Sequence, residues 1–305
     1  MQNDAINFTE ELVYQWQEKW SKDDLRKMVE YCANDTVLLP YLLKYLDKDS
    51  VSLECGCGLG QWVVYMSRRG YKMAGVEIVP ECIRVCKEYY PDADIKVGDV
   101  RELPYPDNYF GGYISIGVLE HMIEGPDRSI SEMHRVLKPG GVAIVIVPAL
   151  NYFMRLWYPL REAAVRVFRY NALLRRIFGR PGFTGNIEDS RNRLEEIKKQ
   201  FYPGLWPSIG IDPVKGPMFI EYKCKKGFIE DKIKIRGFEI VEAAPLFHLY
   251  VFNDVFGTIF FREGYDISDP TTLNLNLPGR LLKKAFDLIS PYFFNYAHLY
   301  VVRKI

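Results

Sequence analysis

The chain has 305 residues, with 40 Lys and Arg against 39 Asp and Glu and a formal net charge of +1. Hydrophobic residues make up 48% and charged residues 26%, a globular balance that excludes intrinsic disorder of the whole chain. A charge so close to zero also argues against a protein that holds nucleic acid electrostatically. Aromatic residues reach 14%, which indicates a large apolar pocket or contact surface, or simply a tyrosine-rich core.

The amino-terminal residues carry neither the basic nor the apolar stretch of a secretory signal. The longest apolar run, residues 141–150, is about half as long as a membrane-spanning helix requires. The six cysteines do not suggest a disulfide framework, and Cys55-x-Cys57 and Cys82-x3-Cys86 lack histidines at metal-ligand spacing. We therefore expect a cytoplasmic protein without a metal site.

Residues 1–49 are expected to form helices that precede a sheet. Thr9 and Ser21 are candidate N-caps, the latter with Asp24 at the capping-box position. The apolar residues that follow recur at the spacing of one helix face: Leu25, Met28, Val29 and Cys32.

From residue 50 onward, short apolar runs alternate with helical stretches. Helices are predicted at 61–69 and 80–90. Strands are predicted at 51–53, 73–77, 95–97, 112–116 and 142–148. Alternation with such short connections predicts a parallel sheet covered by helices on both faces, an α/β fold.

This regularity stops after residue 149. Residues 151–216 contain five prolines and are predicted to be an insertion. A helix at 226–236 and a strand at 237–241 restore the alternation, and a second irregular stretch, 253–292, precedes a final strand at 297–303. We predict a single domain, residues 1–305, with a core formed by 50–150, 217–252 and 293–305 and with two insertions.

The strongest signal is the glycine-rich loop Glu54-Cys55-Gly56-Cys57-Gly58-Leu59-Gly60, directly after the first strand. Glycines allow a sharp turn and the close approach of a ligand, and the amides at the start of the next helix face that ligand. Compared with the dinucleotide pattern G-x-G-x-x-G, the third glycine comes one residue early and an acid precedes the first. That acid, Glu54, suits a cationic amino group better than a pyrophosphate.

Two further acids follow the next two strands. Glu77 ends the second strand, where a carboxylate can bind both hydroxyls of a ribose. Asp99 follows the third strand, where it can accept a hydrogen bond from an adenine amino group. Each acid alone would pass as an ordinary loop carboxylate, but one acid each for an ammonium, a ribose and an adenine describes S-adenosylmethionine.

Together these motifs resemble those of the class I S-adenosylmethionine-dependent methyltransferases, of the small-molecule type. The matching stretches are Leu53 to Gly60, Gly75-Val76-Glu77, Gly98-Asp99-Val100-Arg101-Glu102-Leu103-Pro104-Tyr105, Gly117-Val118-Leu119-Glu120-His121 and Arg135-Val136-Leu137-Lys138-Pro139-Gly140-Gly141. The resemblance covers about half of the chain, residues 50–150 with 237–241 and 299–304. One departure is Gly111, where the family usually has an acid after the Phe; we interpret this position as structural.

The resemblance implies a Rossmann-like, seven-stranded, mostly parallel sheet with an antiparallel last strand, N-terminal helices and a helical insertion after the fifth strand. It implies S-adenosylmethionine as cofactor and a small-molecule acceptor that the two insertions cover. The cofactor-binding residues that it implies are Glu54, Cys55, Gly56, Gly58, Gly60, Glu77, Ile78, Asp99, Val100 and Ile116.

Residues that act on the acceptor must come from loops beyond the carboxyl ends of the strands. His121 and His248 are candidate bases there, although His121 is expected more to order the loop over the cofactor. Asn151 and Tyr152 follow the fifth strand and are candidate acceptor contacts. The absence of Asn-Pro-Pro-Tyr after the fourth strand disfavours amino-group methylation of DNA bases.

The segment 155–180 holds seven arginines and one acid, interleaved with apolar and aromatic residues. This pattern fits an amphipathic helix on an anionic membrane surface, a lid over an apolar or phosphorylated acceptor, or a helix with a solvated basic face. We therefore expect methyl transfer to an organic small molecule, lipid-like or glycan-linked, with peripheral membrane contact through 155–180. The alternative is a catalytically silent cofactor-binding scaffold or membrane-surface module.

Overall fold

The computed structural model describes residues 13, 16, 24–156, 158, 186–212, 215–247, 249, 251, 257–262 and 274–305. The chain divides into two compact units, which are described one at a time. The first comprises Met1–Val147, Ile229–Ala243 and Leu299–Ile305, and the second Pro148–Phe228 and Ala244–His298. Among the described residues we find no helix with both the length and the apolar character needed to cross a membrane.

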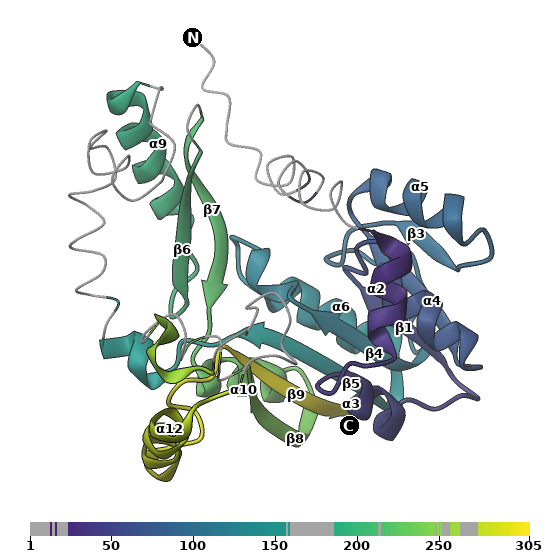
Figure 1. The fold of residues 1–305 in the computed structure, drawn as a ribbon. Helices are drawn as coiled ribbons and strands as arrows, with labels where there is room; N and C mark the ends of the chain where they lie inside the picture. Colours follow the sequence, from purple (N-terminus) through teal and green to yellow (C-terminus); the bar gives the residue numbers. More distant parts are fainter. Residues whose placement is uncertain are drawn as a thin grey trace. The chain divides into compact units, whose positions relative to one another are not determined.

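A seven-stranded sheet has the strand order β3-β2-β1-β4-β5-β9-β8 (Figure 1). Its first five strands pair in parallel, which confirms the predicted α/β architecture. The strands are β1 (Val51–Cys55), β2 (Lys72–Glu77), β3 (Ile95–Val97), β4 (Phe110–Ile116), β5 (Leu137–Pro148), β8 (Phe238–Leu246) and β9 (Ala297–Lys304).

The last strand runs against its neighbour, as the resemblance implies. Beyond the carboxyl end of β5, the N–H of Ala149 donates to the carbonyl oxygen of Tyr296 at 2.8 Å, just before β9 begins. Near the start of β5, the ammonium of Lys304 donates to the carbonyl oxygen of Leu137 at 2.8 Å, where β9 ends. Because the start of one strand meets the end of the other, β9 is antiparallel to β5.

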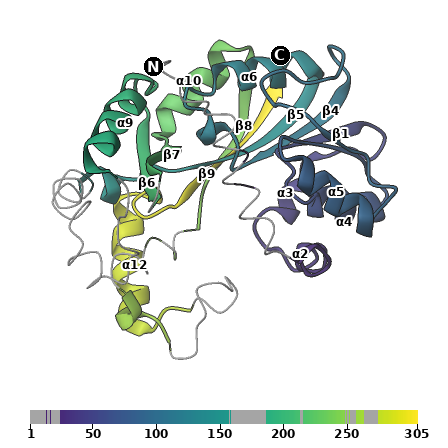
Figure 2. The ribbon, with the colours of Figure 1, turned by 90° about the horizontal axis from the view of Figure 1, so that it is seen from above.

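Helices cover both faces of the sheet. In Figure 2, α3 (Leu39–Tyr45), α4 (Gln61–Arg68) and α5 (Pro80–Tyr89) lie on one side of the strands, and α6 (Asp127–Val136) and α10 (Lys226–Ile235) on the other. Helices on both sides bury the central strands, in which Leu53, Ile114 and Val145 are fully buried. Asp127 of α6 binds both Lys232 and Arg236, which ties α6 to α10 and the residue after it.

The helix α2 (Leu25–Cys32) begins later than the capping prediction placed it. Its N-cap is Asp24, whose carboxylate accepts from the backbone N–H of Arg26 at 3.1 Å and of Lys27 at 3.4 Å. The prediction of Ser21 as the cap of this helix was therefore wrong, because Asp24 itself stands directly before the first helical residue and serves as cap. The apolar face is as predicted, with Leu25, Val29 and Cys32 buried.

Gly111, the departure from the family pattern, lies near the start of β4 against the side chain of Ser50. A Cβ on Gly111 would lie 2.5 Å from the Cβ of Ser50, and one on Gly112 would lie 2.3 Å from the hydroxyl oxygen of Ser52. A larger residue at Gly111 would require the side chain of Ser50 to move, which favours a structural role for this position.

The second unit contains a hairpin that the sequence pattern did not reveal. β6 (Trp206–Asp212) and β7 (Gly216–Lys223) form a separate two-stranded antiparallel sheet. α9 (Ile187–Lys199) is fastened to it where Nε of Arg193 donates to the carbonyl oxygen of Pro217 at 2.8 Å. The predicted return to the core at residue 217 therefore needs correction, because a pattern of strand residues does not say which strand will be its partner.

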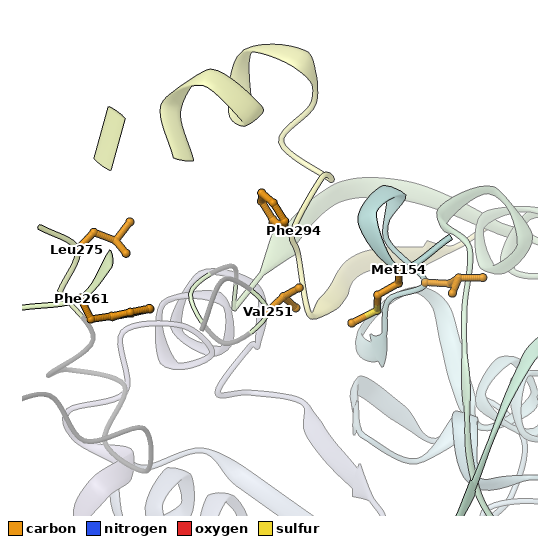
Figure 3. Close-up of a cluster of buried hydrophobic side chains, with 6 residues drawn as sticks. Met154, Val251, Phe261, Leu275 and Phe294 are labelled. Atoms are coloured by element: carbon orange, nitrogen blue, oxygen red, sulfur yellow. The ribbon is translucent and has the colours of Figure 1, made fainter. Parts of the chain in front are cut away.

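An apolar cluster forms the core of the second unit (Figure 3). It joins the segment after β5, the end of the short helix η2 (Gly257–Phe260) and the residues on either side of α12 (Leu277–Ile289). The inner side of α12 packs on this cluster, with the ring of Phe286 4.6 Å from that of Phe293 and 4.8 Å from that of Phe294. The buried members are Leu150, Met154, Val251, Phe261, Leu275 and Phe294.

Candidate active site

The glycine-rich loop joins β1 to α4 through residues with left-handed backbone conformations. Gly56 has φ of +67° and Gly58 of +54°, angles that side chains with a Cβ rarely adopt. A Cβ on Gly56 would also lie 2.4 Å from Cγ2 of Val118. The N–H groups of Gly56 and Cys57 donate to the carbonyl oxygen of Val76 at 2.8 and 3.0 Å, which fixes the loop to β2.

Gly60 is the N-cap of α4 and has no side chain with which to bind the free N–H groups of the first turn. One of them, on Val63, hydrogen-bonds to the carboxyl group of Glu54. Glu54 itself is 3% exposed, and its Oε2 has no hydrogen-bond partner among the described residues. Burial raises the pKa of this carboxyl to about 8. A buried acid with an unpartnered oxygen is a position that a cationic group would complete.

Glu77 stands at the end of β2 and faces the same loop. Its Oε2 accepts from the N–H of Gly58 at 2.9 Å and its Oε1 from the N–H of Val79 at 3.0 Å. Burial raises the pKa of this carboxyl, and the backbone N–H groups oppose the rise. Each oxygen keeps acceptor capacity beyond these bonds, so the carboxylate can take two neighbouring hydroxyls.

Asp99, after β3, is engaged by a neighbour that the sequence analysis did not consider. Nε of Arg101 lies 2.9 and 3.0 Å from its two oxygens, Nη2 lies 2.5 Å from Oδ2, and the backbone N–H of Arg101 donates to Oδ1 at 2.8 Å. Burial acts to raise the pKa of Asp99, but the bonds and charge of Arg101 outweigh it and lower the pKa. The other side of the guanidinium binds Glu124 at 2.7 Å.

The remaining residues of the predicted cofactor site differ in what they can offer. Ile78 and Ile116 are half-buried and keep surface that can contact a ligand. Val100 is buried. Cys55 is fully buried and burial raises the pKa of its thiol, so only its backbone can meet a ligand.

His121 ends the short helix η1 (Leu119–His121) after β4. Its ring packs edge-on against Trp16, with centroids 4.9 Å apart, and its Nε2 lies 3.9 Å from Oε1 of Glu120. These contacts hold the ring in place, which favours the loop-ordering role over that of a freely accessible base. His248 lies outside the described residues, and so does the basic segment 155–180 except for residues 155, 156 and 158.

Asn151 and Tyr152 belong to the second unit and behave differently. Asn151 is buried; its Nδ2 donates to the carbonyl oxygen of Asn295 at 2.9 Å and its Oδ1 accepts from the N–H of Met154 at 2.7 Å. Its side chain therefore fixes the local backbone, a role that departs from the predicted acceptor contact. Tyr152 is 48% exposed and can meet a ligand.

Comparison with known proteins finds one family whose pattern includes the glycine-rich loop, Glu77 and Asp99. Residues 53–145 match the model of a methyltransferase domain. The chain carries a class I S-adenosylmethionine-dependent methyltransferase domain. The cofactor of such a domain is S-adenosylmethionine, and the residues present fit it: Glu54 offers an unpartnered buried oxygen, and Gly56 and Gly58 give the loop after it a sharp turn through left-handed backbone conformations.

The methyltransferase domain has relatives among named enzymes. A demethylmenaquinone methyltransferase of Chlorobaculum parvum is 29% identical over 105 residues, 34% of this chain and 43% of the relative. A demethylmenaquinone methyltransferase of Staphylococcus aureus is 29% identical over 199 residues, 58% of this chain and 78% of the relative. This chain thus spans about two fifths of the length of the first curated relatives that it matches.

The fold of the methyltransferase also occurs in solved structures. A SAM-dependent methyltransferase from Methanosarcina mazei superposes with a TM-score of 0.52 at 18% identity, covering 87% of this chain and 97% of the other. This likeness confirms the Rossmann-like architecture with its mostly parallel sheet.

Proposed function

We propose that this protein transfers a methyl group from S-adenosylmethionine to a small organic acceptor. The observation that carries the proposal is Glu54, a buried carboxyl with an unpartnered oxygen, followed by a loop whose sharp turn depends on the left-handed glycines Gly56 and Gly58. When bound there, the cofactor supplies an electrophilic methyl group on a sulfonium. Glu54 would hold its ammonium, Glu77 its ribose hydroxyls, and Asp99, Val100, Ile78 and Ile116 would surround its adenine.

The contribution of these residues is to position rather than to react. Binding two reactants in line can supply about 7–11 kcal/mol of the lowering of the barrier. A general base would add roughly 10²–10⁴-fold. The two candidate bases are His121 and His248. The ring of His121 contacts Trp16 and lies near Glu120, whereas His248 is outside the described residues. Methyl transfer therefore does not require either histidine if the acceptor is already nucleophilic.

The acceptor that we propose is lipid-like. The support comes from the relatives named demethylmenaquinone methyltransferases, because the name gives a quinone as their acceptor. A glycan-linked acceptor was the other expectation, and no observation on the described residues favours it.

An exposed apolar side of α12 supports contact with a lipid surface. Leu277, Leu281, Leu288 and Ile289 are 60–82% exposed although the opposite side of this helix packs on the core of its unit. Arg280 and Lys284 are exposed beside them, and the acid of this helix, Asp287, is paired with Lys283 at 2.5 Å. Apolar residues flanked by cations match an anionic lipid surface. Contact through 155–180 remains a separate prediction.

Vesicle co-sedimentation tests the lipid contact. We expect binding to vesicles of phosphatidylglycerol and phosphatidylcholine and much weaker binding to phosphatidylcholine alone, since each cation contributes about 1 kcal/mol. The double variant Leu281→Ser, Leu288→Ser should lose most of this binding, whereas Leu43→Ser, which changes an exposed leucine of α3, should not. Equal sedimentation of all three proteins would contradict the role of α12.

Cofactor binding and turnover together test the main proposal. Calorimetry should show binding of S-adenosylmethionine, and a membrane-lipid extract that contains quinols should make S-adenosylhomocysteine accumulate over time. The isosteric variant Glu54→Gln should weaken the first and slow the second. Binding without product in any extract would support the catalytically silent scaffold instead, and no binding at all would refute both interpretations.

A further inference from the structure

A pocket in the second unit is lined in part by the candidate acceptor contacts Asn151 and Tyr152 and by none of the predicted cofactor-binding residues. Its volume is about 270 Å³, just below the roughly 300–1,000 Å³ of most small-molecule pockets. It lies between the residues that follow β5, the start of α10 and the segments before and within β9. Its lining consists of Leu150, Asn151, Tyr152, Arg155, Lys225, Lys226, Gly227, Phe228, Tyr292 and His298.

The charge of this pocket has one sign. Arg155, Lys225 and Lys226 line it, and none of its described lining residues is acidic. Two of the cations lie over aromatic rings of the same wall: the guanidinium carbon of Arg155 is 5.6 Å from the centroid of Tyr152, and Nζ of Lys226 is 5.3 Å from that of Tyr292. Contacts of this kind hold a cation in place without neutralising its charge.

His298 is a neutral part of the wall. Its Nε2 lies 3.2 Å from the carbonyl oxygen of Cys224, which can only accept, so Nε2 carries the proton. Its Nδ1 lies 3.1 Å from Nδ2 of Asn295 and therefore accepts. Burial lowers the pKa of His298 to about 4, in agreement with this arrangement. The positive charge of the described lining at neutral pH comes from Arg155, Lys225 and Lys226.

Aromatic rings supply the rest of the recognition surface. Tyr152, Phe228 and Tyr292 line the same pocket, and flat apolar faces of this kind pack against a ring or another planar group. The N-terminus of α10 adds a partial positive charge from the helix dipole, and no acid in the first turn of that helix offsets it. The pocket thus offers three cations for an anion and three rings for the body that carries it.

We propose that this pocket binds a small organic acid, an aromatic or similarly planar molecule that carries a phosphate monoester or a carboxylate. Arg155, Lys225 and Lys226 bind the anionic group, and Tyr152, Phe228 and Tyr292 contact the planar part. The site goes beyond methyl transfer and does not depend on it, because every residue that builds it lies in the second unit.

Calorimetry with the full chain, in the absence of S-adenosylmethionine, tests the proposal with four probes: phenyl phosphate, benzoate, inorganic phosphate and phenol. We expect phenyl phosphate or benzoate to bind, inorganic phosphate to bind more weakly, and phenol not to bind. Whichever aromatic acid binds more tightly identifies the anionic group. Raising the ionic strength to 1 M should weaken the interaction, since the Debye length then falls to about 3 Å.

Variants assign the binding to the pocket. Lys225→Gln and Lys226→Gln should each weaken phenyl phosphate or benzoate about tenfold, which corresponds to 1.4 kcal/mol. Arg191→Gln, an exposed cation of α9 that does not line the pocket, should leave the affinity unchanged. Tyr292→Leu should weaken the aromatic acids but not inorganic phosphate.

Two results would overturn the proposal: binding of phenol as tight as that of phenyl phosphate, or the same affinity in Arg191→Gln and both lysine variants. Circular dichroism of each variant checks that the fold is retained. Binding of S-adenosylmethionine, measured separately, reports on the methyltransferase domain and so distinguishes a failure of this proposal from a failure of the proposed function.

Discussion

The two candidate sites of this molecule contain ionisable groups of opposite kind, and the two sites bury these groups to different degrees. In the methyltransferase domain the ionisable groups are carboxyls, and Glu54 and Glu77 are 3% and 6% exposed. In the pocket of the second unit they are cations, and Arg155 and Lys225 are exposed. The first arrangement is costly to the folded protein unless a ligand compensates it, whereas the second costs little.

This difference in burial indicates what kind of ligand each site can bind. A buried carboxyl whose pKa is raised to about 8 lacks a counter-charge, and a cation of the right size would supply it. Exposed cations need no such partner, so we infer their role from the shape of the pocket and from its aromatic rings. The ligand of the methyltransferase domain is therefore inferred from a buried carboxyl without a counter-charge. The ligand of the second unit is inferred from the match between the pocket and an aromatic anion.

The largest expected effect comes from the loop between β1 and α4. Gly58→Val should reduce the affinity for S-adenosylmethionine more than about 150-fold, because a branched side chain at a φ of +54° strains the turn and fills the space beside it. Binding of phenyl phosphate to the second unit should not change. Calorimetry with both ligands measures this, and a parallel loss of both would show that the two sites are not independent.

The sequence predicted this loop well because its signals are local. Each glycine and each acid stands at a fixed distance from the end of its own strand, and in a parallel sheet those ends meet at one edge. The five parallel strands, the helices α4 and α5 and the acids Glu54 and Glu77 could all be predicted from such patterns. The hydrogen bonds between Arg101 and Asp99 were not predicted, although the two residues are separated by only one residue in the sequence. Sequence spacing does not show in which direction the side chain of an arginine points.

The second unit was hardly predictable for the same reason. The β6–β7 hairpin arises from strand pairing that the composition of the segment does not encode, and the sequence of residues 151–216 predicted an insertion without predicting its strands. The pocket combines residues from three distant parts of the chain, 150–155, 225–228 and 292–298. The capping role of Asn151 depends on Asn295, which no local pattern could indicate.

Glu77 offers the next largest effect. Glu77→Ala should weaken binding of S-adenosylmethionine by about 5–150-fold, or 1–3 kcal/mol, because it removes the bonds to the ribose and frees the N–H of Gly58 and Val79. The affinity of Glu77→Gln for S-adenosylmethionine should lie between that of Glu77→Ala and that of the original protein, since the amide oxygen can still accept a hydrogen bond from one N–H. Unchanged affinity of Glu77→Ala would disprove the ribose role.

Glu54 should make the affinity depend on pH. Its pKa is about 8 in the folded protein without cofactor, and an ammonium beside it favours the ionised form. Binding must then release a proton below pH 8, so the affinity should rise by up to roughly 30-fold from pH 6 to pH 7.5. Calorimetry in buffers of different ionisation enthalpy detects that proton, and Glu54→Gln should abolish both the release and the rise.

The same group should affect stability with the opposite dependence on pH. The unfolded chain ionises this carboxyl near its ordinary value of 4.5, and the folded protein does so near 8. Between these values the folded state holds the extra proton, so the free energy of unfolding should fall as the pH rises, by on the order of a few kcal/mol. Denaturant titrations at pH 5 and pH 8 should show a smaller fall in Glu54→Gln.

Asp99 should have the smallest effect on cofactor affinity of these residues. Four contacts with Arg101 already occupy its oxygens, so an adenine amino group must share an acceptor that is partly neutralised. Asp99→Ala should therefore weaken binding by less than about fivefold, which is below 1 kcal/mol.

The larger effect of Asp99→Ala should be on the stability of the folded protein. Arg101 is 17% exposed and would lose a partner, at a cost of about 1–3 kcal/mol. The double variant Asp99→Ala, Arg101→Gln should recover part of that loss in a thermal melt, since it also removes the guanidinium that has lost one of its carboxylate partners. If Asp99→Ala instead weakens the cofactor as strongly as Glu77→Ala while the melting temperature stays the same, then Arg101 releases Asp99 when adenine binds, and the carboxylate belongs to the cofactor after all.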